Sequence, residues 1–79
     1  MSAEADALTG LRKSARATRT EHGLLPPTIS IGGGASVYYA DELIEITAAR
    51  AAGMDDDAIR GIVRRQIERR RVAITAAAA

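Results

Sequence analysis

The sequence predicts a small, mainly α-helical domain: a helix, a short β-hairpin, and then two helices joined by a tight Gly-Met-Asp turn, the last helix being the longest. Three observations lead to this prediction. Apolar residues recur at helical spacing in three segments, prolines and glycines separate the first two segments, and β-branched residues flank the glycines. A chain of 79 residues is expected to form one domain, spanning residues 1–79.

The first helix is predicted over residues 3–20. Its apolar stripe is thin, because Leu8 and Leu11 are its large aliphatic residues, and Gly10 weakens its middle by about 1 kcal/mol relative to alanine. Gly23 can close its C-terminal end, since glycine readily adopts the left-handed conformation found there.

Residues 28–39 are predicted to form a hairpin or an extended linker. Two prolines end any preceding helix, and β-branched residues lie on both sides of the glycines at 32–34. A phosphate-binding loop is disfavoured, because no lysine follows the glycines and the spacing does not match. We therefore expect the glycines to form a turn.

The second and third helices are predicted over residues 40–52 and 55–73, with a fraying alanine-rich tail over residues 74–79. Gly53 is a good stop for the second helix, and Asp55 can cap the third. Small and apolar residues also recur at the positions of a helix-turn-helix unit, whose helices meet at a steep angle. These positions are Ala49, Gly53, Met54, Ile59 and Ile62.

The expected core is small, because 17 of the 37 hydrophobic residues are alanine. We expect it to contain Leu8, Leu11, Leu25, Ile31, Leu43, Ile44, Ile59, Ile62, Val63 and Ile67. A core in a chain of this size supplies only about 3–5 kcal/mol, so a partner that extends it is favourable. The leading hypothesis is a protein-interaction module, acting as a homo-oligomer or as an accessory part of a larger assembly such as a phage particle or an enzyme complex. Its expected contact residues lie on the last helix and the hairpin: Ile59, Ile62, Val63, Ile67, Val37 and Tyr39.

The charge pattern is compatible with other functions. Residues 24–57 carry a net charge of −5 and residues 58–79 a net charge of +5. These charges could attract an anionic partner, attract another copy of the chain, or pair within one molecule. A DNA-binding helix-turn-helix protein is the alternative hypothesis, although the carboxylates of Asp55, Asp56 and Asp57 would repel phosphates at the tip of the recognition helix. The candidate contacts to nucleic acid or an acidic partner are Arg60, Arg64, Arg65, Arg69 and Arg71. A further alternative is an inhibitor that covers a nucleic-acid-binding site with the acidic residues 55–57.

Catalysis is not expected. The chain has no cysteine and one histidine, His22, and no pattern ties a nucleophile to a base or gathers metal ligands. We therefore expect no cofactor, no metal and no small-molecule substrate. We also expect no membrane binding, and a cytoplasmic protein.

Overall fold

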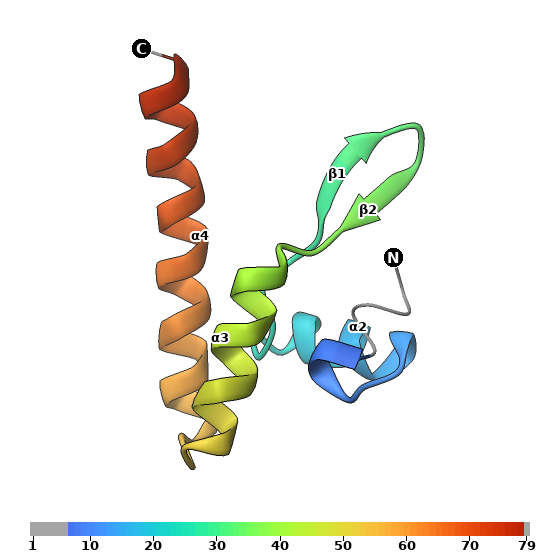
Figure 1. The fold of residues 1–79 in the computed structure, drawn as a ribbon, viewed down its shortest axis with the longest axis vertical. Coiled ribbons are helices and arrows are strands. Elements are labelled where there is room, and N and C mark those ends of the chain that lie inside the picture. The colour runs from blue at the N-terminus through green and yellow to red at the C-terminus, as the bar shows by residue number, and fades with distance from the viewer. Residues whose placement is uncertain (1–6, 79) are drawn as a thin grey trace.

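The computed structural model describes residues 7–78, with side chains as far as residue 76, and confirms the predicted fold class. The protein is mainly helical, has a two-stranded antiparallel hairpin, and ends in its longest helix. The elements are α2 (Lys13–Glu21), β1 (Ile29–Gly32), β2 (Ala35–Val37), α3 (Ala40–Ala51) and α4 (Asp56–Ala78). Figure 1 shows α3 beside the first part of α4, with α2 to one side and the hairpin extending away.

The single helix expected over residues 3–20 is wrong in the described part of that range. Residues 7–9 are helical, the chain then turns at Gly10, and α2 starts only at Lys13. Gly10 has φ +68°, in the left-handed region where glycine is the favoured residue, and this breaks the helix rather than merely weakening it. Residues 3–6 lie outside the described residues. Gly23 closes α2 as predicted: with φ +75° it lets Leu24 N–H bond to the carbonyl of Arg19.

The connection between α3 and α4 is the predicted tight turn. Gly53 has φ +86°, and the amide of Met54 donates to the carbonyl of Ala49 at 3.1 Å, which satisfies the end of α3. Asp55 caps α4, because its Oδ1 accepts from the Ala58 amide at 2.9 Å.

The steep angle expected between α3 and α4 is not observed. Arg50 pairs with Asp56 beside the turn, and Glu42 pairs with Arg70 at the other end of α3. Glu42 and Arg70 lie about 14 Å and 21 Å along their helices from the turn, so a right angle would hold them roughly 25 Å apart. The helices therefore form an antiparallel pair, which is not the crossing of a helix-turn-helix unit.

The core lies between α3, the first half of α4 and the segment after α2. Its buried apolar residues are Leu24, Leu25, Leu43, Ile46, Ala49, Ile59, Ile62 and Val63, with Leu8, Leu11 and Tyr38 packed against them. Three residues expected in the core are instead exposed: Ile31, Ile44 and Ile67. In α3 the buried face contains Ile46 rather than Ile44, because the face that carries Glu42 and Glu45 turns toward the arginines of α4.

The hairpin and the end of α4 extend beyond this core. The strands pair within the chain, with Ile29 opposite Val37, and Gly33 and Gly34 form a turn in which both have positive φ. The tail expected to fray from residue 74 is part of α4, which continues to Ala78. The last eight residues of α4 rise about 12 Å past Arg70, and Figure 1 shows this end and the hairpin pointing the same way as two separate arms.

Candidate functional site

The opposite charges of the middle and the end of the chain pair within the molecule. The least exposed pair joins Glu42 and Arg70, whose side chains are 13% and 16% exposed. Arg70 donates from Nε to Glu42 at 3.0 Å, donates a further hydrogen bond to the carbonyl of Pro27 at 3.0 Å, and has its guanidinium 5.0 Å from the centre of the Tyr39 ring. One arginine thus links α4 to α3 and to both ends of the hairpin segment.

A buried glutamine lies beside this pair. Gln66 is fully buried, and its side-chain amide donates to the backbone carbonyl of Glu42 at 3.1 Å and to Oε1 of Glu45 at 2.7 Å. Arg69 donates to the same Glu45 oxygen at 2.7 Å. The hydrogen bond from Gln66, supported by Arg69 and opposed by partial burial, holds the pKa of Glu45 below its usual value.

The predicted acidic patch is also largely engaged. Asp55 caps α4, Asp56 pairs with Arg50 at 2.8 Å, and Asp57 pairs with Arg60 at 3.1 Å. The hydrogen bond from Arg50 lowers the pKa of Asp56. The three carboxylates are therefore used in starting α4 and in holding the turn.

The predicted basic contacts fall into two groups. Arg60, Arg69 and Arg71 each pair with a carboxylate, and Arg60 also donates to the carbonyl of His22 at 3.0 Å. Arg64 and Arg65 are exposed on α4 and form no ion pair with any residue that the structure describes. Arg70 is not among the predicted basic contacts, although it belongs to the same run of arginines as Arg69 and Arg71 and contacts Glu42, Pro27 and Tyr39. The signal for it was the spacing of Glu42 and Glu45 on α3, which matches Arg69 and Arg70 once the helices run antiparallel.

The predicted interaction residues are only partly available to a partner. Ile59, Ile62 and Val63 belong to the buried core, because α3 and residues 24–25 cover this part of α4, so their assignment as contact residues is wrong. Val37 is half-buried, whereas Tyr39 and Ile67 are exposed. The expectation that the apolar side of the last helix contacts a partner therefore fails for the first half of α4.

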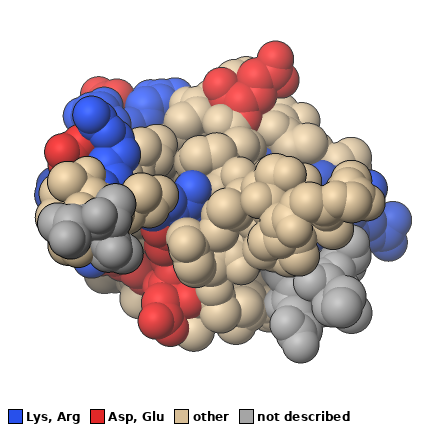
Figure 2. Space-filling model, turned by 90° about the horizontal axis from the view of Figure 1, so that it is seen from above, with Lys and Arg blue, Asp and Glu red and all other residues tan. Residues whose placement is uncertain are grey.

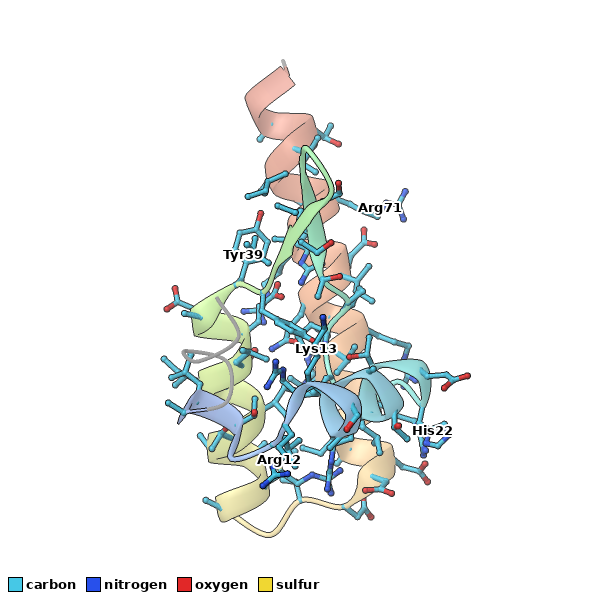
Figure 3. The ribbon with its side chains drawn as sticks, turned by 90° about the vertical axis from the view of Figure 1, so that its right-hand side faces the viewer. Arg12, Lys13, His22, Tyr39 and Arg71 are labelled. Carbon is cyan, nitrogen blue, oxygen red and sulfur yellow. The ribbon has the colours of Figure 1, made fainter. Side chains whose placement is uncertain are left out.

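The second half of α4 and the hairpin present apolar side chains to solvent. Ile31, Tyr39, Val72 and Ile74 are 65%, 49%, 59% and 69% exposed. A groove at the base of the two arms is lined by Tyr39 and Ala40 from the start of α3 and by Ala73 and Ile74 from α4. Charged residues make up the rest of its lining: Asp41, Glu42, Glu45, Arg69 and Arg70. Figure 3 shows Tyr39 at the base of the hairpin, above Arg12 and His22 on the lower body.

The two arms carry no charged residue. The stretches 24–40 and 72–79 contain none of the 21 charged residues of the chain. We define the end face as residues 28–39 and 72–78, which form the hairpin arm and the α4 arm. Figure 2 views the molecule from this end: uncharged residues cover most of the middle and right of the surface, while charged groups gather on the left and along the margins.

Residues 7–78 meet neither the requirements of a metal site nor those of a membrane-spanning helix. No group of three or more potential metal ligands comes together in this range, and none of its helices combines the length and apolar character needed to cross a membrane. Comparisons with protein-family models, curated proteins and solved structures find no match for the chain.

Proposed function

We propose that this chain is a protein-interaction module that binds its partner through the end face. The observation that carries the proposal is the separation of charge from apolar exposure: every charged residue lies outside the arms, and the arms hold exposed Ile31, Tyr39, Val72 and Ile74. Large exposed apolar side chains on a small protein are a common mark of a protein-binding site. Here they lie on two arms, and charged residues line the groove between the arms.

The weak internal support of both arms strengthens the proposal. A lone two-stranded hairpin is marginally stable in water, and a helix gains most of its stability from packing. Within residues 7–78, the element pairs that pack extensively are β1 with β2 and α3 with α4, so no other element supports the hairpin to a comparable extent. A partner on the end face would supply packing for both arms at once.

Cross-linking in cells tests this surface. A photo-reactive amino acid at position 74 or position 31 should give covalent adducts with a bound protein, and the same group at position 64 should not. Position 64 is a matched control, because it is exposed on α4 but lies outside the end face. Adducts from position 64 alone, or from none of the three positions, would contradict the proposal.

Duplex DNA binding is the second candidate function, favoured by Arg64 and Arg65, which are exposed and form no ion pair within residues 7–78. Phosphate contacts by arginine make affinity fall steeply with salt. An Arg64→Glu, Arg65→Glu variant should then lose affinity for a labelled DNA duplex in fluorescence anisotropy, while an Ile74→Arg variant should keep it. The inhibitor hypothesis has less support, because Asp56 and Asp57 are paired within the chain.

A further inference from the structure

We infer that the partner on the end face is a second copy of this chain, arranged end to end about a two-fold axis. The inference rests on the proposed function and names the occupant of the same surface. It starts from three observations: the lack of charge on the arms, the size of the end face, and the chemistry of the opposite end of the molecule.

The lack of charge makes the end face compatible with itself. Two copies that meet through a charged patch bring like charges together, which costs free energy unless each charge meets an opposite one. Residues 28–39 and 72–78 present none, so contact between two end faces buries apolar groups without desolvating a charged side chain on either arm. The groove between the arms does hold charged residues. Glu42 pairs there with Arg70 and Glu45 with Arg69, and Asp41 lies beside them.

The end face is slightly smaller than one side of a typical specific interface. It comprises 19 residues in two ranges, 28–39 and 72–78. A typical specific interface uses roughly 20–30 residues on each side. Ala73 lies in the groove beside Ile74, and its small side chain allows another helix to approach α4 closely.

The charges at the opposite end of the molecule favour a two-fold arrangement over a head-to-tail one. Figure 1 places the α3–α4 turn at the far end from the arms, and this turn carries Arg50 and the carboxylates 55–57. A head-to-tail contact would press uncharged arms onto these charges and desolvate them without replacement partners. End-face-to-end-face contact avoids this cost and closes after two copies, as a two-fold interface does.

Sedimentation equilibrium of the full chain tests the inference with two isoleucine substitutions. The wild-type chain should have twice its 8.3 kDa mass at micromolar concentration. Ile74→Arg should weaken the dimer by at least about 100-fold, because it buries an unpaired charge in the interface. Ile44→Arg is the matched control: Ile44 is 50% exposed on α3, outside the end face, and this variant should remain dimeric. Circular dichroism checks that each variant keeps its helices.

A distance measurement checks the arrangement with labels at the two ends of the molecule. Spin labels at Ala76→Cys should come close to each other across the dimer, and labels at Asp57→Cys should lie farther apart than the 39 Å length of one copy. A chain that stays monomeric at every concentration, an Ile74→Arg variant that stays dimeric, or a short separation between labels at position 57 would overturn the inference. If the wild-type chain is monomeric but position 74 cross-links to a different protein in cells, the proposed function stands and only the second-copy partner is wrong.

Discussion

Neighbouring arginines on α4 have very different environments, and rotation about the helix axis explains the difference. Arg70 faces α3 and contacts Glu42, Pro27 and Tyr39, with only 16% of its side chain exposed. Arg71 is one residue further on, which turns it away by about 100°, and its 76% exposed side chain pairs with Glu68 of the same helix. Residue type alone therefore did not distinguish a structural arginine from a solvent-exposed one.

Removing Arg70 should destabilise the protein far more than removing Arg71. Arg70→Met leaves the Glu42 carboxylate largely buried without its partner, and we expect a loss of about 2–4 kcal/mol in the free energy of unfolding. Arg71→Met breaks an exposed pair and should cost no more than about 0.5 kcal/mol. Urea unfolding of the two variants measures the difference, and equal losses would show that the Glu42–Arg70 pair is not a principal support of the fold.

Gln66 acts on Glu45 through a hydrogen bond to the ionised carboxylate. Because the pKa of Glu45 is lower in the folded chain than its usual value of 4.5, the ionised form stabilises the fold. This contribution is complete above the usual value and is lost as the pH falls through the lowered pKa.

Gln66→Leu should therefore raise the pKa of Glu45 toward its usual value and make stability less sensitive to acid. The titration of Glu45 is measured by carbon NMR of its carboxyl group, and Tm is compared between about pH 6 and about pH 3. Glu68→Gln is the control, because Glu68 pairs with Arg71 on the exposed side of α4 and its loss should leave the pKa of Glu45 unchanged. An unchanged pKa in Gln66→Leu would assign the shift to Arg69 instead.

Among the elements, those with strong end signals were predicted well. Gly53 and Asp55 fixed the boundary between α3 and α4 within one residue, because backbone geometry and capping act locally. The first helix and part of the buried face of α3 were predicted less well. Gly10 was predicted to weaken the first helix, whereas it ends a helical turn. In α3, alanines at several positions make the buried face hard to assign from the sequence, and the structure buries Ile46 rather than Ile44.

The cap at Asp55 gives a prediction for α4 as an element. Asp55→Ala removes the acceptor for the Ala58 amide and should lower the free energy of unfolding by about 1 kcal/mol. Asp57→Ala provides the comparison, because the Asp57 side chain is 94% exposed and its pair with Arg60 is solvated. In thermal unfolding followed by circular dichroism, Asp55→Ala should have a clearly lower Tm than Asp57→Ala. A lower Tm for Asp57→Ala would show that the cap contributes little to stability.

At the scale of the whole molecule, the two arms are uncharged and all the charged residues lie on the remaining part. The sequence showed opposite net charges in the middle and end segments but not their internal pairing, because pairing depends on the antiparallel alignment of α3 and α4. The candidate site was predicted only in part for the same reason: Tyr39 is in the end face, whereas Ile59, Ile62 and Val63 are enclosed by the fold.

Hydrogen exchange should distinguish the protected core from the two arms. Amides in α3 and in α4 up to Arg70 should exchange slowly at every protein concentration, because the core protects them. Amides of residues 29–37 and 72–78 should exchange faster in dilute solution and slow down as the concentration rises and the end face is covered. Exchange of the arms that is slow and independent of concentration would mean that they are stable without a partner.

The spacing of the ion pairs between α3 and α4 also sets the alignment of the two helices. Sliding α4 by four residues, roughly one turn, would place Glu42 opposite Gln66 or Ile74 and would remove its guanidinium partner. Such a slip would also separate Arg50 from Asp56 beside the turn. Apolar contacts among alanines and isoleucines tolerate a shift of this kind, but a largely buried carboxylate that loses its arginine does not. The ion pairs therefore specify one alignment of α3 against α4.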